Sequence, residues 1–237
     1  MERVLMSLFT RTRFWHDATH ELYADSARRF LAAELVPNIT RYVEQGEVDR
    51  SFWRKAGEAG LMAGSVPDAD GGAGGGPGFA AITIYEQAAT SDTSWGFAIQ
   101  VIVIHYLIAF GSDAQKAEWL PGLINGETIG ALAMTEPGCG SDVQAIRTHA
   151  RRAGKVYRIN GSKMFITNGR MADLVLLATK TDTVEGSKGI SLILVDGNTA
   201  QGLERGQHLN KLGMRGSDTA ELVFMDVEVP LDNLLGP

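Results

Sequence analysis

Two short segments have the residue types needed to hold a flat polar cofactor. Leu132–Ser141 reads LAMTEPGCGS and Phe165–Thr167 reads FIT, so small residues, hydroxyl groups and a turn occur close together. Glycines let a backbone approach a ligand closely, and Thr and Phe are enriched in β-strands. The two segments therefore predict strands of a β domain that present backbone donors and side-chain hydroxyls to such a ligand.

The loop Thr135–Asp142, TEPGCGSD, carries the most specific of these signals. Its N–H groups or the Ser141 hydroxyl could meet a phosphate. Gly138 and Gly140 match part of a dinucleotide fingerprint, but the third glycine is missing and the next segment reads as a strand, which argues against a Rossmann site. From these residues alone, a ligand loop and an ordinary β-hairpin connection are equally compatible with the pattern.

The composition excludes several classes of protein. A chain of 237 residues can bury a sizeable core, and we favour two domains. The net charge is −6, with 22 basic residues interleaved with 28 acidic ones, so a nucleic-acid partner is excluded. Cys139 is the single cysteine, which rules out an intrachain disulfide and a zinc cluster and predicts a reducing, cytoplasmic location.

Neither export nor membrane insertion is expected. The N-terminal segment MERVLMSLFTRTRFW lacks the uninterrupted apolar core of a signal peptide. The most apolar stretch, Trp95–Phe110, is shorter than the ~20 residues that a bilayer needs, and it predicts a buried helix. His105 within it has no second His or carboxylate four residues away, so we interpret it as a satisfied core histidine and not as a ligand or base.

The first half of the chain has the apolar spacing of helices, with apolar residues returning every three or four positions. A first helix carries an apolar stripe from Leu22 to Leu35 and is broken at Pro37. Ser51 is predicted to cap a second, short helix that ends near Gly60. Further helices are predicted at Phe79–Ala89, Ser94–Phe110 and Asp113–Trp119.

The glycine-rich segment Gly71–Gly78, GGAGGGPG, is predicted to be a flexible loop, because glycine at this density does not form a helix. A phosphate-binding loop is the alternative. No predicted strand precedes the segment and no Lys-Ser or Lys-Thr pair follows it, so we favour the plain loop.

From Thr128 onward the apolar period shortens and strand-forming residues dominate. Asn160-Gly161 is predicted as a two-residue hairpin turn between two strands. The predicted fold class is α+β, with an N-terminal all-α domain over residues 1–127 and an antiparallel β-barrel or β-sandwich domain over residues 128–237; a doubly wound sheet is disfavoured. The predicted strands are Thr128–Met134, Ala145–Arg151, Lys155–Ile159, Lys163–Ile166, Leu174–Thr179, Ile190–Val195 and Ala220–Met225.

Three collinear motifs resemble the acyl-CoA dehydrogenase family of flavoenzymes. They are AMTEPGCGSD at Ala133–Asp142, INGSKMFITNG at Ile159–Gly169 and KLGMRGSDTAELVFMDVEVP at Lys211–Pro230. The first third of the chain is also similar, in Asp25–Pro37 and Phe52–Leu61. The resemblance runs nearly end to end, and it implies the family's N-terminal helical and middle β domains without its C-terminal helical bundle.

The resemblance implies that FAD is the cofactor and assigns roles to single residues. The strand backbone and the Thr135 hydroxyl are expected to bind the polar edge of the flavin. Gly140 and Ser141 are expected to meet the pyrophosphate, and Ser141 also matches a position near the CoA arm, which makes it the expected substrate-binding residue. The implied cofactor-binding residues are Leu132, Ala133, Met134, Thr135, Gly140, Ser141, Phe165, Ile166 and Thr167.

Phe165 departs from the family pattern, in which this segment usually reads Trp-Ile-Thr. A phenyl ring keeps a face for packing on the flavin but lacks the indole N–H, so any polar contact made by that donor is lost. The Thr167 hydroxyl is expected to approach the reactive region of the flavin. Without its Ile-Thr neighbours, Phe165 would be interpreted as a core aromatic.

The reaction implied by the resemblance is α,β-dehydrogenation of an acyl-CoA thioester to the trans-2-enoyl-CoA. It needs a carboxylate base for the α-proton, hydrogen bonds to the developing enolate and FAD to accept the hydride. In the family the base belongs to the C-terminal helical domain. Glu136 is the nearest substitute here, but it belongs to the flavin loop, where a structural role is expected, and no catalytic residue is named.

The expected partners follow from the same resemblance. They are an acyl-CoA substrate, an electron-transfer flavoprotein as electron acceptor, and either further copies of the chain or a complementing C-terminal domain. Because that domain is not in the sequence, we expect the isolated chain to bind FAD weakly and to show little turnover. The alternatives are an acyl-CoA oxidase or flavin-dependent monooxygenase of the same fold, and a non-catalytic subunit.

Overall fold

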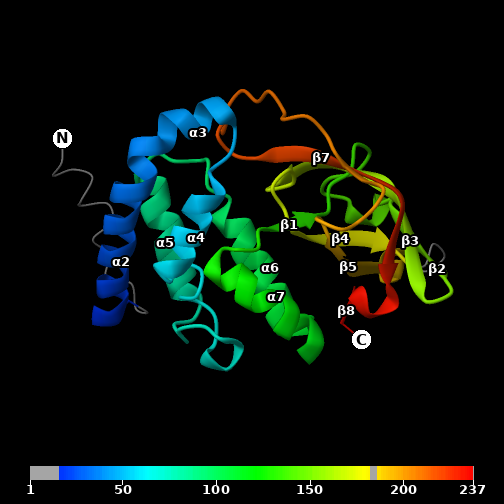
Figure 1. Ribbon diagram of the computed structural model, residues 1–237, viewed down its shortest axis with the longest axis horizontal. Helices are drawn as coiled ribbons and strands as arrows, with labels where there is room; N and C mark the ends of the chain where they lie inside the picture. The colour runs from blue at the N-terminus through cyan, green and yellow to red at the C-terminus, as the bar shows by residue number, and fades with distance from the viewer. Residues whose placement is uncertain (1–15, 182–185, 237) are drawn as a thin grey trace.

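The computed structural model describes residues 16–181 and 186–236. The N-terminal segment that argued against a signal peptide, residues 1–15, lies outside them. A helical part is followed along the chain by a β-sheet part, and the two lie side by side (Figure 1). Among the described residues no helix is long and apolar enough to cross a lipid bilayer.

The first predicted helix is confirmed, but its α-helical part ends earlier than expected. Helix α2 covers Ala18–Phe30 and begins at Asp17, whose carboxylate accepts hydrogen bonds from the N–H groups of the first turn. A π-helical turn at Leu31–Leu35 and a 3₁₀ turn at Val36–Asn38 follow, so Pro37 does mark a break in the α-helix. Helix α3, Ile39–Gln45, then starts at once and was not expected.

The predicted cap of the second helix is wrong. Helix α4 covers Arg50–Glu58, so Ser51 lies inside its first turn, and Asp49 occupies the N-cap position without a side-chain hydrogen bond. The Asp49 carboxylate instead binds Arg41 at 2.6 Å, which leaves it unable to cap. Phe52 and Trp53 point into the core as the apolar spacing indicates.

The glycine-rich loop is shorter than predicted. Helix α5 covers Pro77–Ala89, so the last two residues of the predicted loop form the first turn of a helix. Gly76 makes this possible, because it adopts φ 73°, a left-handed conformation that favours glycine, immediately before the helix. Proline is tolerated in the first turn, where its missing N–H has no partner to lose.

Helices α6 and α7 differ from their predicted bounds at one end each. Helix α6 covers Phe97–Phe110 and starts after Ser94, whose N–H is held outside the helix by the Asp92 carboxylate at 3.0 Å. Helix α7 covers Asp113–Asn125 and passes through Pro121, because the buried apolar residues on both sides of the proline continue one stripe. His105 is half-buried and bonded to Ser65 at 3.1 Å, so the interpretation as a satisfied histidine is confirmed.

The β part is one mixed sheet that does not close into a barrel. The strand order is β6-β7-β3-β2-β4-β5-β8, and β1 pairs with β4 in parallel. Most neighbours are antiparallel, and no doubly wound arrangement occurs in the described chain. The strands are β1 Gly130–Ala133, β2 His149–Ala153, β3 Val156–Thr167, β4 Leu174–Lys180, β5 Ile190–Asp196, β6 Leu203–Arg205, β7 Thr219–Pro230 and β8 Leu234–Leu235.

The predicted hairpin at Asn160-Gly161 is wrong, because these residues lie inside β3. The pairing of β3 with β7 shifts register between Ile159 and Gly161, so the Asn-Gly pair forms a bulge. The Asn160 amide donates to the Asp226 carboxylate at 2.9 Å, which holds the bulge to β7. The turn between β2 and β3 contains Gly154 at φ 66° instead.

The predicted strand at Ala145–Arg151 is also corrected, because a 3₁₀ turn occupies its start and β2 begins at His149.

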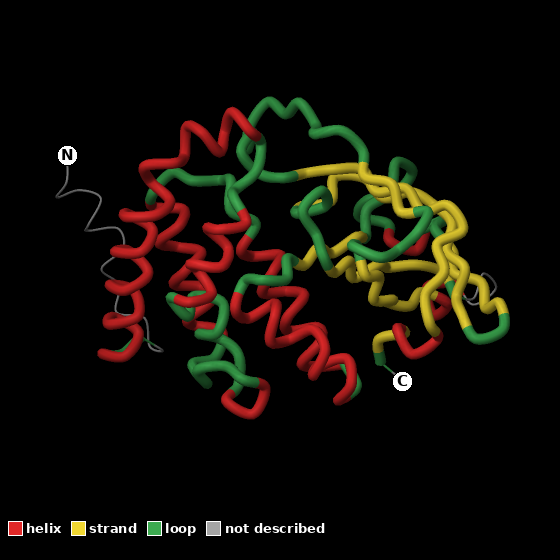
Figure 2. Tube along the Cα trace, viewed as in Figure 1, coloured by secondary structure: helices red, strands yellow, loops and turns green. Residues whose placement is uncertain are grey.

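The helices lie beside the strands of the sheet (Figure 2). One apolar cluster combines helix residues with residues of β4, β5 and β8, and a second cluster lies within the β part. Buried polar side chains also join the two parts. The Gln100 amide, fully buried on α6, donates to the carbonyls of Leu123 and Thr128 and accepts from the Gly130 N–H at the start of β1. Asn168, directly after β3, donates to the Gly96 and Gly130 carbonyls. These contacts fix the start of β1 relative to α6 and to the end of β3.

Candidate functional site

The two segments that opened the sequence analysis lie side by side. Leu132 and Ala133 are on β1, and Met134 and Thr135 continue this strand beyond its pairing with β4. The continuation runs beside β3, because the Met164 N–H donates to the Thr135 carbonyl at 2.8 Å. The Thr135 hydroxyl makes no hydrogen bond within the part of the chain that the structure describes, so it is free to bind a ligand.

The glycine turn that follows is closed on itself. Glu136 and Cys139 exchange two backbone hydrogen bonds, at 3.0 and 3.1 Å. Gly138 and Gly140 are exposed, and a Cβ atom built on either would meet no other atom within 4 Å. Ser141 is exposed and its hydroxyl has no partner among the described residues. The turn therefore offers open space and an unused hydroxyl next to the end of the Thr135 strand.

Phe165 has an unusual backbone and an unusual exposure for an aromatic residue in a strand. Its φ is 60°, in the left-handed region that bulky residues avoid, and 64% of it is exposed. The pairing of β3 with β7 is irregular between Lys163 and Ile166, so the strand bulges at Phe165 and turns its ring outward. Ile166 returns to the core, and Thr167 is half-buried with a hydroxyl that has no hydrogen-bond partner among the described residues. An exposed ring on a strained backbone is typical of a binding site.

A cavity of about 280 Å³ opens beside Thr167, between the helices and the sheet. Asp92 provides a buried carboxylate at this cavity, but that carboxylate already accepts hydrogen bonds from the Gln87 amide and from the N–H groups of Ser94 and Trp95. The walls are otherwise mostly apolar. The cavity is lined by Ile84, Gln87, Ala88, Asp92, Thr93, Trp95, Gly96, Ala98, Ile99, Thr167, Met214 and Ser217.

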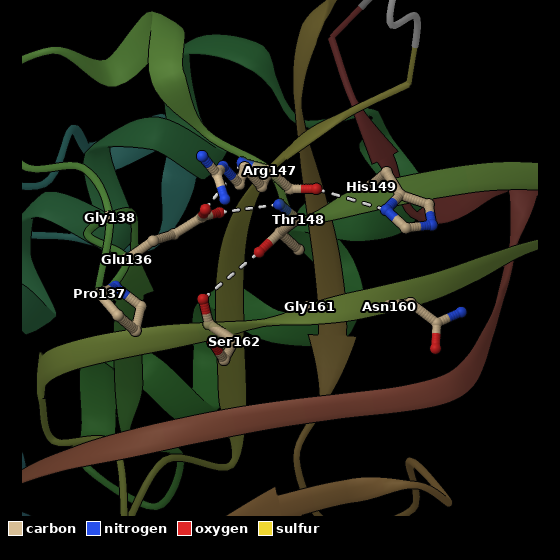
Figure 3. A pocket seen from close by; sticks show the side chains of 9 residues that line it. All are labelled: Glu136, Pro137, Gly138, Arg147, Thr148, His149, Asn160, Gly161 and Ser162. Carbon is tan, nitrogen blue, oxygen red and sulfur yellow. Dashed lines mark hydrogen bonds between the residues drawn. The ribbon is translucent and has the colours of Figure 1, made fainter.

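A second cavity of about 320 Å³ is lined in part by the glycine turn (Figure 3). The turn, the segment before β2 and the bulge of β3 form its walls. Figure 3 shows the Glu136 side chain reaching across to the backbone of Arg147 and Thr148. The cavity is lined by Glu136, Pro137, Gly138, Arg147, Thr148, His149, Asn160, Gly161 and Ser162.

A buried ion pair lies beneath the Thr135 strand. The Lys163 ammonium is fully buried, 2.8 Å from a Glu136 carboxylate oxygen and 2.9 Å from the Met134 carbonyl. Burial acts to raise the pKa of the Glu136 carboxyl, but hydrogen bonds from Lys163 and from the following segment outweigh it, so the pKa falls below its usual value. Burial lowers the pKa of the Lys163 ammonium, against the effect of its carboxylate partner.

The two segments singled out in the sequence do lie next to one another, but the sequence analysis did not single out the residues that hold them. Lys163, Asn168 and Asp92 are functional candidates that the sequence analysis passed over. The available signal was a lysine at the start of the predicted strand Lys163–Ile166, within a segment that the structure places inside β3. A buried charge in a strand usually has a partner, which here is Glu136.

Comparison with known proteins gives two adjoining family matches. The model described as "Acyl-CoA dehydrogenase, N-terminal domain" matches residues 17–127, and the one described as "Acyl-CoA dehydrogenase, middle domain" matches residues 131–227. Together they cover most of the chain, and they meet between the last helix of the helical part and the first strand of the sheet.

Named relatives agree with these matches. The chain is 42% identical over 220 residues to the mitochondrial long-chain specific acyl-CoA dehydrogenase of Mus musculus, covering 92% of this chain and 51% of that protein. It is 38% identical over 225 residues to the mitochondrial isovaleryl-CoA dehydrogenase of Oryza sativa subsp. japonica, covering 93% and 54%. The chain therefore spans about half the length of these curated relatives.

Solved structures share the fold. The crystal structure of acyl-CoA dehydrogenase from Geobacillus kaustophilus superposes with a TM-score of 0.92 at 38% identity, covering 95% of this chain and 60% of that one. The acyl-CoA dehydrogenase of Bacillus anthracis, complexed with FAD, gives a TM-score of 0.82 at 31% identity, covering 94% of this chain and 38% of that one.

Proposed function

The chain belongs to the acyl-CoA dehydrogenase family, and from that premise we propose that it provides the flavin-binding part of an FAD-dependent enzyme that oxidises an acyl-CoA thioester. The observation that carries this proposal is the outward Phe165 ring, held at φ 60° beside the unpaired hydroxyls of Thr135 and Thr167. We call Leu132–Thr135, Gly140–Ser141 and Phe165–Thr167 the flavin face.

The chemistry of the flavin face fits FAD. A flat ring system with a polar edge needs an apolar surface beside hydrogen-bond donors, and the Phe165 ring and the two threonine hydroxyls supply these. A diphosphate needs backbone N–H groups and hydroxyls in open space, which the turn at Gly140 and Ser141 supplies. When bound, FAD supplies the hydride acceptor for the β-carbon of the substrate.

The cavity beside Thr167 is our proposed site for the acyl chain. Its walls are mostly apolar, and its mouth is shared with the half-buried end of the flavin face. Ile84 and Ala88 of α5 and Ile99 of α6 form apolar walls, so the packing of these helices would set the chain length accepted. Ser141, exposed on the turn, is proposed to contact the CoA arm.

We assign no catalytic base among the described residues. Glu136 is engaged by Lys163 and by two backbone N–H groups, all of which stabilise its charged form. Asp92, at the acyl cavity, is held by hydrogen bonds from Gln87, Ser94 and Trp95. A general base must have an oxygen within hydrogen-bond reach of the proton it removes, and hydrogen bonds within the protein already engage both carboxylates.

The partners proposed are an acyl-CoA thioester and, as electron acceptor, an electron-transfer flavoprotein. The second is supported by likeness to a structure titled as an electron transferring flavoprotein of Acidaminococcus fermentans, with a TM-score of 0.89 and 32% identity. Assembly into a homo-oligomer, or with a C-terminal domain, and a cytoplasmic location remain predictions from the sequence. The boundary between residues 127 and 128 is likewise our proposed division of the chain.

The experiment that tests this function is titration of FAD with the purified chain, followed by the fluorescence of the free flavin. We expect saturable binding that FMN and ADP alone reproduce poorly, and Phe165→Ala is expected to weaken it about tenfold or more. Phe110→Ala, which removes an aromatic ring that is 54% exposed on α6, is the matched control. Absence of saturable binding, or equal losses in the two variants, would overturn the proposal.

A further inference from the structure

Lys163 is an unusual choice of residue for its place in the fold. It lies on β3 with no exposed surface, between the buried core residues Ile159 and Ile166. Removing an ammonium group from water is costly, and well-packed apolar side chains commonly replace buried ion pairs without loss of stability. Packing alone therefore does not account for a charge at this position.

The contacts of Lys163 and Glu136 join three segments of the chain. The ammonium bonds the Glu136 carboxylate and the Met134 carbonyl, at 2.8 and 2.9 Å. The same carboxylate accepts the N–H groups of Arg147 at 2.7 Å and of Thr148 at 3.0 Å, in the segment that leads into β2. The pair thus ties the end of the β1 extension to β3 on one side and to β2 on the other.

These contacts hold the part of the flavin face that extends beyond the β1–β4 ladder. The pairing of β1 with β4 ends at Ala133, so Met134 and Thr135 extend beyond the ladder. Their carbonyls are held from β3, one by the Lys163 ammonium and the other by the Met164 N–H. With both carbonyls fixed toward β3, the Thr135 hydroxyl remains without a partner among the described residues.

We propose that Lys163 and Glu136 are positioning residues: a charge-balanced pair that holds Met134 and Thr135 in the conformation that binds the flavin. Because the pair carries no net charge, it fixes the strand without favouring either the neutral oxidised flavin or the anionic reduced one. This inference rests on the proposed function. If the pair only stabilised the fold, its loss would not change the relative affinities for oxidised and reduced FAD. As positioning residues that balance each other's charge, Lys163 and Glu136 affect both the affinity for FAD and that ratio.

The test compares the dissociation constants of oxidised and of dithionite-reduced FAD, measured anaerobically on the purified chain. Lys163→Met is expected to weaken binding of oxidised FAD about tenfold, because the strand end is released. Binding of reduced FAD is expected to fall by about a further tenfold, because the unpaired Glu136 carboxylate repels the anion. A tenfold change in the ratio of the two constants corresponds to about 30 mV in the two-electron potential.

Glu136→Gln should change that ratio in the opposite direction, because it leaves a cation without its carboxylate partner. Lys163→Arg, which keeps the charge, should retain the wild-type ratio. Arg158→Met is the matched control. Arg158 lies on β3, as Lys163 does, and it pairs with Glu228 of β7, but both of these side chains are half-exposed. This variant should leave both constants unchanged.

The double variant Lys163→Met with Glu136→Gln keeps the test decisive if Lys163→Met does not fold. It contains no unpaired charge, and we expect weaker binding of both flavin forms with the wild-type ratio. Wild-type constants in the double variant, or an unchanged ratio in every single variant, would overturn the inference while leaving the proposed function intact. Failure of the wild-type chain to bind either form of FAD would overturn the proposed function, and this inference with it.

Discussion

The junction between the helices and the sheet uses its polar side chains in the opposite way to the flavin face. At the junction, the side chains of Gln100, Asn168 and Asp173 form hydrogen bonds with backbone groups of the protein. Asp173 also forms an ion pair with Arg50 at 2.8 Å. On the flavin face, the hydroxyls of Thr135 and Thr167 have no partner among the described residues.

The difference separates polar groups that build the fold from those available for binding. A buried polar group that lacks a partner destabilises a protein, and Gln100, Asn168 and Asp173 bond to backbone groups that are buried at the junction. A partly exposed hydroxyl can bond to water at little cost until a ligand replaces that water. Substitutions at the junction should therefore reduce stability, whereas those on the flavin face should reduce affinity.

Gln100→Leu is expected to have the largest effect on stability. It removes the partner of three backbone groups on α7, before β1 and at the start of β1. Unmet buried groups cost about 1–3 kcal/mol each, so we expect the free energy of unfolding in urea to fall by about 3 kcal/mol or more. Ile102→Ala, at a partly exposed position of α6, is the control. If Gln100→Leu lowers the free energy of unfolding less than this control does, Gln100 does not stabilise the junction.

Asp218→Asn is expected to stabilise the protein in a pH-dependent way. Burial raises the pKa of the Asp218 carboxyl, although backbone N–H groups and Arg170 oppose the shift. The stability gained by the protonated form is therefore fully present below the ordinary pKa of about 3.9 and is lost as the pH rises through the raised value.

At neutral pH the charged form of Asp218 costs stability, and one of its oxygens is buried without a partner. A neutral amide should raise the free energy of unfolding by about 1 kcal/mol there, and the gain should disappear in acid. Urea unfolding of both proteins across the pH range measures this. A constant difference at every pH would show that titration of Asp218 is not the cause.

Phe165→Asn sharpens the comparison, because it should affect stability and affinity in opposite directions. Asn tolerates the left-handed backbone better than Phe, and the exposed ring buries little surface. We expect a gain of about 0.5 kcal/mol in unfolding free energy together with about tenfold weaker FAD binding. Loss of both stability and affinity would mean that Phe165 is a core residue.

Thr167→Val should have the smallest effect on stability, because it replaces an unpaired hydroxyl with a methyl group of the same shape. We expect the free energy of unfolding to change by less than about 0.5 kcal/mol, with FAD binding weakened about fivefold. Thr179→Val, at a buried and unbonded hydroxyl on β4, serves as the matched control and should leave FAD binding unchanged. Equal FAD affinity in the two variants would show that the Thr167 hydroxyl does not contribute to FAD binding.

The sequence was sufficient to predict a helical part followed by a β part, because apolar periodicity reflects burial directly. It failed where a side chain had a competing partner. Asp49, bound to Arg41, leaves α4 without a side-chain cap, and Asn160, bound to Asp226, forms a bulge instead of a turn. Both partners are far enough along the chain that local turn and capping preferences could not reveal them.

The residues that we propose as the flavin face could be selected from the sequence because glycines, hydroxyls and an aromatic occur together in short motifs. Their supports could not, because Lys163 and Glu136 are separated in sequence and meet only when β3 runs beside the extension of β1. The left-handed backbone of Phe165 is likewise a product of the irregular β3–β7 pairing. Each of these depends on register, which a single strand pattern does not determine.

Amide hydrogen exchange with and without saturating FAD tests the central claim most directly, because it reports which backbone segments the cofactor covers. We expect protection to concentrate in peptides spanning 132–141 and 164–168, with little change around Arg205–His208, which line a separate surface cavity. Protection confined to that cavity, or absent from both segments of the flavin face, would contradict the account.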